Sequence, residues 1–367
     1  MQSKANKKDA QEMPMRVINH KTMRIIIGTI ALQMPIVVWI LSGHKELSSI
    51  SISYWTDTRD IFVGSLVAVA FFLSAYNGSG ECKRDIEYYL SKLACIFAIL
   101  VALFPTKDFS ECTDCAPNWV VHISDIVFLK PHQVHNAAAI LLFICLILLM
   151  AFFSLRARNK GKLSRSRFYR VISLGMLMGM PLIYVLGELS SLYEPVFAVE
   201  FWGLLLFGVG WIRAGWYKSE PEEGLPVGAT LLTEVEVDPR NKHVPTSIDV
   251  EAGGRYFFTA KGCWCDWFLE CGPHGWGPDW NPLSRRNRVT RKSLFLLCGN
   301  VGQNDEYAFP IGGRCTWTVP TEVDALAQDE RKLYLFANDW ESMYRNNKQL
   351  EPKEGGPLKV SIYRLPG

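Results

Sequence analysis

The chain has 367 residues, more than one compact core normally uses, so its length predicts two domains. Lysine and arginine number 39 against 36 aspartates and glutamates, a net charge of +3 that argues against a dedicated nucleic-acid-binding protein. Hydrophobic residues make up 49% of the chain, and long apolar runs crowd the part before residue 220.

Six apolar runs follow a basic N-terminal arm at residues 1–23. Each is roughly long enough to cross a bilayer core when its flanks are counted. They lie at about 24–43, 61–76, 91–105, 136–155, 170–187 and 196–214. The sequence therefore predicts an α-helical transmembrane bundle of about six spans over residues 24–216. Four or five spans is the alternative, because the second and third runs are short.

Basic residues set the expected orientation, because lysine and arginine near the spans are retained on the cytoplasmic side. The connection after the fourth run carries seven of them and no acid: Arg156, Arg158, Lys160, Lys162, Arg165, Arg167 and Arg170. The N-terminal arm and the connection after the second run are also basic. A six-span chain has all three on the inside, where they suit the anionic head groups of the lipid bilayer. The C-terminal region is then cytoplasmic.

Two histidines on the opposite side form a candidate metal site. His132 and His135 stand at i and i+3 at the start of a helix and share a face. With Asp60 or Glu188 nearby they can bind zinc, as a hydrolase site requires. In outline this resembles the integral-membrane ceramidase-like hydrolases, which implies a metal-dependent lipid hydrolase as one alternative function. The commoner interpretation is that these groups cap helix ends or meet water and lipid head groups.

Three short stretches of the membrane half carry a second, fainter resemblance. They are Ser53 to Gly64, the turn Tyr76-Asn77-Gly78, and Ala102-Leu103-Phe104-Pro105. Together they resemble a family of uncharacterised bacterial multi-span proteins distantly similar to Frag1/DRAM-type membrane proteins. The resemblance assigns no chemistry, but it implies a bacterial inner membrane as the setting.

The composition changes around residues 217–227, which read as a linker. Lys218 to Pro226 has charges, two prolines and a glycine but no apolar run. Beyond it, residues 228–367 consist of short strand-like segments separated by Gly, Pro, Asn and Asp, which is typical of an antiparallel sandwich. We therefore expect an all-β, jelly-roll-like sandwich domain after the membrane bundle.

The stretch Asn338 to Asn347 clusters oxygen donors in a loop between two strand-like runs. Ca²⁺ takes roughly 6–8 oxygen ligands from carboxylates, amides and carbonyls. Asp339, followed seven positions later by Asn346 and Asn347, has the donors to wrap around one ion. The alternative is that these residues merely shape a turn, which Asn and Asp favour through side-chain to backbone hydrogen bonds.

The same stretch closely resembles the calcium and sugar loop of the bacterial galactophilic lectin family (PA-IL-like). Upstream segments occur in the family's order over about residues 228–367: Thr246 to Val250, the Gly262-Cys263-Trp264 turn, Gly272 to Trp276, Leu297 to Gly302, and Trp317 to Pro320. The resemblance implies a calcium-assisted, galactoside-like carbohydrate-binding domain. It also implies that a glycan or glycoconjugate is the partner. Lectin-fold domains often assemble, so a homo-oligomer is a further expectation.

Carried over residue by residue, the resemblance gives Asp339, Asn346 and Asn347 as side-chain calcium ligands. The carbonyl of Met343 and one carbonyl near Asp266 or Trp267 complete the shell. Asp339 and Asn346 would also face the sugar.

Aromatic side chains such as Trp267 and Trp340 can stack on the apolar face of a sugar. Trp340, beside Asp339, is the one expected to contact a ligand.

The chain departs from the family in one place. Where the family carries a histidine and a glutamine that grip another sugar hydroxyl, this chain reads Gly277-Pro278-Asp279-Trp280-Asn281-Pro282. The departure weakens the case for galactose and favours, as an alternative, a lectin-fold protein-interaction module on a membrane anchor.

Seven of the ten cysteines carry predictions. Cys112 and Cys115 are expected on the outside, where they can form a small disulfide loop. The five C-terminal cysteines, Cys263, Cys265, Cys271, Cys298 and Cys315, show no metal spacing. Free buried thiols in a reducing cytosol are the simplest prediction for them.

Overall fold

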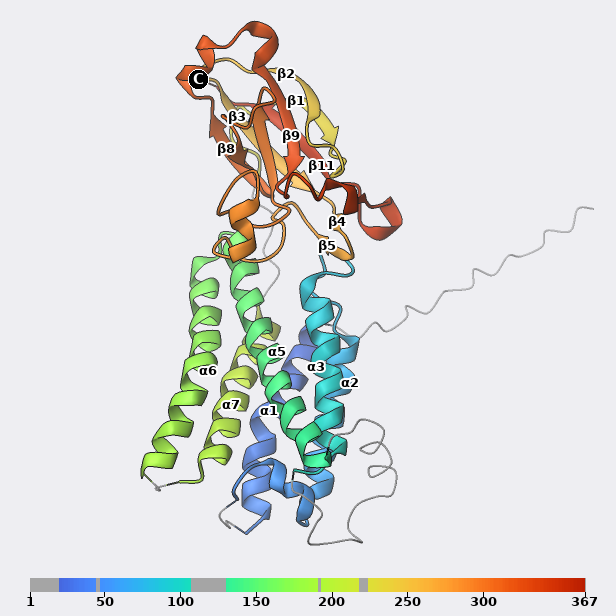
Figure 1. Ribbon diagram of the computed structural model, residues 1–367, viewed down its shortest axis with the longest axis vertical. Helices are drawn as coiled ribbons and strands as arrows, with labels where there is room; N and C mark the ends of the chain where they lie inside the picture. The colour runs from blue at the N-terminus through green and yellow to red at the C-terminus, as the bar shows by residue number, and fades with distance from the viewer. Residues whose placement is uncertain (1–19, 44–46, 107–129, 191–192, 218–223, 367) are drawn as a thin grey trace, which may run out of the picture.

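The structure is a computed structural model that describes residues 20–43, 47–106, 130–190, 193–217 and 224–366. A helical region precedes an all-β region of antiparallel sheets, which confirms the predicted order (Figure 1). The two regions meet end to end, with the β region above one end of the helices (Figure 1). The predicted Cys112–Cys115 pair lies outside the described residues.

Six long helices of the described chain form a closed ring in which each contacts the next and α7 returns to α1. They are α1 (His20–Leu41), α2 (Arg59–Ala75), α3 (Ile86–Leu103), α5 (Pro131–Asn159), α6 (Leu163–Ser190) and α7 (Pro195–Trp216). Five of them are long and apolar enough to cross a membrane. The exception is α2, which has 17 residues. The predicted number of about six spans is therefore not confirmed: five described helices qualify on length and composition, and they are the helices of a membrane protein.

Two contacts show how the sequence closes this ring. Gly28 of α1 and Gly208 of α7 let the two backbones approach, because an added Cβ at Gly28 would lie 2.7 Å from the Gly208 carbonyl oxygen. Small residues serve membrane helices in this way, since lipid tails leave packing as the main attraction. Trp211 is fully buried and stacks on Phe153 with ring centroids 5.1 Å apart.

Two four-stranded antiparallel sheets enclose the core of the β region. One has the order β1-β11-β3-β8 and the other β2-β9-β6-β7. Their strands are β1 (Thr230–Glu236), β2 (Val244–Asp249), β3 (Arg255–Lys261), β6 (Leu297–Val301), β7 (Phe309–Pro310), β8 (Arg314–Thr318), β9 (Lys332–Ala337) and β11 (Lys359–Arg364). Burial alternates along β2, so its inward side chains meet those of the facing sheet.

A third sheet, in the order β10-β4-β5, connects the β region to the helices. It consists of β4 (Trp264–Asp266), β5 (Leu269–Cys271) and β10 (Asn347–Gln349). The Glu270 backbone N–H donates to the Arg84 carbonyl at 3.1 Å, and the Glu270 carboxylate accepts from the N–H groups of Lys83 and Arg84 at 3.0 Å each. The loop between α2 and α3 is thereby hydrogen-bonded to β5.

The same loop overturns one prediction about the cysteines. Cys263 is not a free thiol, because it forms a disulfide with Cys82. Cys265, Cys271, Cys298 and Cys315 are free, as predicted. The error arose because the sequence gives no sign that the turn after β3 folds back onto a loop of the helical region.

Candidate functional site

The loop between β9 and β10 is held in place by its first residue. The Asn338 Oδ1 atom accepts the Val289 backbone N–H at 2.8 Å, and its Nδ2 donates to the carbonyls of Val289 and Ser293. Asn338 is fully buried and has both ends of its amide occupied. These hydrogen bonds hold the backbone at Asn338, and they thereby fix where the next residue, Asp339, begins.

Four side chains with oxygen donors meet behind this loop. Asn347 is the register partner of Asp266 across the β10–β4 ladder. Its Nδ2 donates to Asp339 Oδ2 at 3.1 Å and to the Pro239 carbonyl at 3.0 Å. Asn346 donates from Nδ2 to Asp266 Oδ1 at 3.2 Å. The four side chains thus form two hydrogen-bonded pairs, Asn347 with Asp339 and Asn346 with Asp266, which the β10–β4 register places next to each other.

Each of the two asparagine amides has an oxygen without a hydrogen-bond partner in the described part of the chain. The Oδ1 atoms of Asn346 and Asn347 are buried and accept no hydrogen bond from any described residue. Turning the Asn347 amide around would sacrifice two hydrogen bonds from its Nδ2, so this orientation is fixed by its neighbours. An unpaired buried carbonyl costs about 1–3 kcal/mol. Two of them beside two carboxylates form a site that fits a cation.

The charges give the same indication. Burial, and then the negative charge of Asp339, raises the pKa of Asp266 to about 6. Burial also raises the pKa of Asp339, although hydrogen bonds from the Trp340 backbone and from Asn347 oppose the shift. No cation from a described lysine or arginine forms a salt bridge with either group. A divalent cation would balance the two negative charges.

The other predicted contributors lie around this cluster. The Met343 carbonyl accepts the Asn346 N–H at 3.1 Å and keeps a second lone pair. The Trp267 carbonyl accepts a weak bond from the Cys265 thiol at 3.5 Å. Trp340 is half-buried and donates from its indole to the Leu283 carbonyl, so its ring lies against the segment that follows β5 rather than free in solvent.

That segment carries the departure from the lectin pattern. Asp279 Oδ1 accepts from both the backbone and the hydroxyl of Ser293 at 3.0 Å, and Asn281 caps a short helix by accepting the Leu283 N–H. Both side chains are therefore engaged within their own loop. Trp280 is 82% exposed and leaves an apolar surface where the family has two polar grips.

The predicted zinc residues of the membrane half do not gather. His135 is buried, with Nδ1 2.7 Å from the Phe104 carbonyl oxygen, which ties α5 to the end of α3. Nowhere in the described parts of the chain do three His, Cys, Asp or Glu side chains form a metal-binding group, so His132 and His135 are not joined by Asp60 or Glu188. The cluster behind the β9–β10 loop instead combines two carboxylates with two amides.

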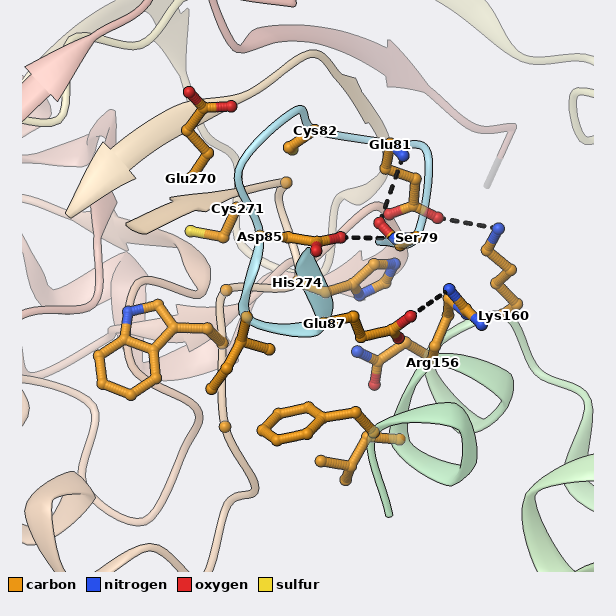
Figure 2. Close-up of a pocket in the computed structure, with 18 residues that line it drawn as sticks. Ser79, Glu81, Cys82, Asp85, Glu87, Arg156, Lys160, Glu270, Cys271 and His274 are labelled. Atoms are coloured by element: carbon orange, nitrogen blue, oxygen red, sulfur yellow. Dashed lines mark hydrogen bonds and ion pairs between the residues drawn. The ribbon is translucent and has the colours of Figure 1, made fainter. Parts of the chain in front are cut away.

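A second cluster lines a cavity of about 90 Å³ between the helices and the β region (Figure 2). Two ion pairs within the helical region line it: Arg156 with Glu87 and Lys160 with Glu81, both at 2.8 Å. His274 enters from the β region, and burial lowers its pKa. The cavity has room for about three water molecules. It is a joint between the two regions rather than a site for a larger ligand.

Sequence reasoning missed two contributors to the oxygen cluster. Trp276 donates from its indole to Asp266 Oδ2 at 3.0 Å, and Pro239 supplies the carbonyl that orients Asn347. Trp276 lay in a motif already singled out, yet only the folded chain brings it to Asp266. The sequence could not have indicated Pro239, because it contributes only its backbone carbonyl, which almost any residue at this position would also offer.

No protein-family model matches the chain, and no curated protein does. The case for a function therefore rests on the geometry of these clusters and on the residue pattern of the loop.

Proposed function

We propose that this chain is a membrane-anchored binding protein whose β region holds Ca²⁺ and uses it to bind a carbohydrate. The observation that carries the proposal is the pair of unpartnered, buried amide oxygens on Asn346 and Asn347 beside two carboxylates. These donors, with the carbonyls of Met343 and Trp267, reach the roughly six ligands that Ca²⁺ requires.

Each residue has a separate task in this proposal. Asp339 and Asp266 supply the negative charge, and the two asparagine oxygens supply neutral ligands. Bound Ca²⁺ would present its open coordination positions to two neighbouring hydroxyls of a sugar. The exposed Trp280 replaces the polar grips of the lectin pattern, which favours a ligand with an apolar face and leaves galactose as one candidate among several.

The membrane half supports the anchoring role. We include α2 as a sixth span, because its 17 residues fall within the range of short spans and it completes the helix ring. Six spans bring both ends of the helical region to one side. The basic connection between α5 and α6 lies at that same end, so we place the β region in the cytoplasm of a bacterial inner membrane.

Calorimetric titration of Ca²⁺ into the full chain in lipid nanodiscs tests the proposal. We expect one site in the wild type and at least a tenfold loss of affinity, about 1.4 kcal/mol, in Asp339→Asn. Asp324→Asn is the matched control, since it removes a mostly exposed carboxylate that pairs with Arg331 elsewhere in the β region. Absence of calcium binding in the wild type would overturn the proposal and leave a protein-interaction module on a membrane anchor.

The sugar is tested next with the same protein. A galactoside and a panel of other monosaccharides are titrated with and without Ca²⁺. Binding that needs the ion and disappears in Asp339→Asn supports carbohydrate recognition, whereas binding that ignores the ion contradicts it.

A further inference from the structure

Two large aromatic side chains form the tip between β4 and β5. Trp267 is 66% exposed and Phe268 is 53% exposed. Trp267 has φ +54, a left-handed backbone that bulky residues seldom adopt, so the chain accepts strain to turn here. Adjacent exposed aromatics at a tight turn mark a contact surface rather than ordinary scatter of apolar residues.

The tip is held against the first turn of α3. The Phe268 ring packs edge-on against Tyr89 of α3, with centroids 5.6 Å apart, and the Tyr89 hydroxyl donates to the Phe268 carbonyl at 3.3 Å. The 18 residues of α3 span only about 27 Å, slightly less than the roughly 30 Å of a hydrocarbon core. A span this short needs its whole length, so Tyr89 in its first turn lies at the edge of the core.

With α3 crossing the core over its whole length, Phe268 would lie where lipid head groups meet acyl chains. Tryptophan and tyrosine are enriched at this level because their rings are apolar and their polar atoms reach water. Lys348 is exposed on β10 next to β4 and places a cation beside the aromatic tip, whereas the nearby Arg84 is paired with Glu270. Anionic head groups attract such cations.

The calcium cluster is built on the same small sheet. Asp266 directly precedes Trp267, and Asn347 pairs with Asp266 in register. Met343, in the loop before β10, is 42% exposed. In Figure 1, β4 and β5 lie at the end of the β region nearest α3. A ligand of the cluster is thus within reach of the lipid leaflet beside α3.

We propose that the ligand of the calcium cluster is the sugar head group of a lipid in that leaflet, which the Trp267–Phe268 tip reaches by dipping into the interfacial layer. This rests on the proposed function and names the class of ligand. Confinement to the same leaflet gives a lipid-borne sugar a far higher effective concentration than a free sugar has. The cluster can then act with few direct contacts, which accounts for the missing polar grips near Asp279.

Linkage gives a sharp test with the full chain in nanodiscs. A head group that coordinates the ion must raise calcium affinity by the factor by which calcium raises its own. Calcium affinity is measured in phosphatidylcholine discs, in discs that also contain a galactosyl diacylglycerol, and in phosphatidylcholine discs with soluble methyl galactoside at the same total concentration. We expect the galactolipid to raise calcium affinity at least about tenfold and the soluble sugar to have little effect.

Two substitutions of Phe268 connect this effect to the tip. Phe268→Ser should lose most of the galactolipid effect while Phe268→Leu, which stays apolar, should keep it. An equal effect of soluble and lipid-borne sugar, no effect of the galactolipid, or an unchanged Phe268→Ser variant would each overturn the inference. Loss of calcium binding in every disc would instead overturn the proposed function, so the two failures are distinguishable.

The depth of the tip is measured independently. Lipids brominated near the head group quench nearby tryptophan fluorescence, and the wild type is compared with Trp267→Phe in the same discs. We expect the wild type to show the greater quenching. Equal quenching in both proteins would show that the tip stays in water and would overturn the inference.

Discussion

Asn346 donates from its Nδ2 atom to Oδ1 of Asp266 across 3.2 Å, and this one bond joins the β9–β10 loop to β4. It also decides where the amide oxygen of Asn346 faces, since the nitrogen end is already engaged. That oxygen is buried and unpartnered among the described residues. The hydrogen bond therefore orients the oxygen that we propose as a calcium ligand. The same oxygen, unpaired, lowers the stability of the fold without calcium.

Asn346→Ala should separate calcium binding from stability. The variant loses a hydrogen bond worth about 1 kcal/mol but also removes an unpaired buried oxygen, so its calcium-free stability should change by less than about 1 kcal/mol. Its calcium affinity should fall at least about tenfold. Asn338→Ala is the contrast, because that amide is fully bonded and its loss should cost about 1–3 kcal/mol with or without calcium. Thermal unfolding with and without Ca²⁺ measures both, and an equal loss of stability in the two variants would contradict the ligand role.

Calcium binding should depend on pH through Asp266. Burial and the charge of Asp339 raise the pKa of Asp266 from 3.8 to about 6, so without calcium the folded protein holds a proton that the unfolded chain releases. The resulting stabilisation is complete below pH 3.8 and is lost as the pH rises to about 6. Since Ca²⁺ competes with this proton, affinity should be about tenfold weaker near pH 5 than near pH 7.

Calorimetry at the two pH values checks this dependence. Asp266→Asn has no proton to release, so its weaker affinity should vary little over the same range. A wild-type affinity that does not change between the two pH values would argue against Asp266 as a ligand.

The junction between the two regions should depend on Glu270. Its carboxylate is nearly fully buried and accepts from two backbone N–H groups and from Arg84 Nε at 2.9 Å. Glu270→Gln should cost about 1–3 kcal/mol, because bonds to a charged acceptor are replaced by weaker ones and the amide nitrogen faces donors. Glu354→Gln, 4.0 Å from Arg84 and partly exposed, should cost less than about 0.5 kcal/mol. Hydrogen exchange at residues 82–84 and 269–271 should quicken only in the first variant, and equal exchange in both would count against the junction.

The ion pair between Glu87 and Arg156 should be strongly coupled. The two atoms lie 2.8 Å apart, and the Glu87 carboxylate also accepts from the Tyr76 hydroxyl at 2.9 Å. Arg156→Met should cost about 3–5 kcal/mol by leaving a buried carboxylate unpaired, and adding Glu87→Gln should recover much of it. Lys160→Met breaks the exposed pair with Glu81 and should cost less than about 1 kcal/mol. Denaturation midpoints of the two single variants and the double variant in detergent complete a double-mutant cycle. Losses of stability that simply add in the double variant would rule out the coupling.

Cys82 and Cys263 report which side of the membrane the β region faces. The structure brings them together as a disulfide, and such bonds persist in oxidising compartments but not in the cytosol. With the β region in the cytoplasm, both thiols should be alkylated when growing cells are quenched in acid and treated with a maleimide. The bond should then form after lysis in air. A pair already resistant to alkylation in quenched cells would reverse the proposed orientation.

The sequence predicted the helices better by position than by extent. The apolar run at 136–155 became α5 at Pro131–Asn159, and the run at 170–187 became α6 at Leu163–Ser190. Hydropathy marks the part of a helix that suits lipid, whereas backbone hydrogen bonds continue into the polar flanks. The apolar run at 61–76 was also recognised, but the helix that it became, α2, has only 17 residues, which is the lower limit of the length of a span.

The sequence alone determined the two regions and the residue types of the β9–β10 loop, because apolar runs, strand alternation and a dense set of oxygen donors are local patterns. Only the tertiary structure decided that Asp266 adds its carboxylate, that Cys82 meets Cys263, and that the β4–β5 turn packs against Tyr89 of α3. Those relationships join segments far apart in the chain. Local pattern sets backbone preference and burial, but the packing of one sheet against a helix end chooses which distant side chains meet.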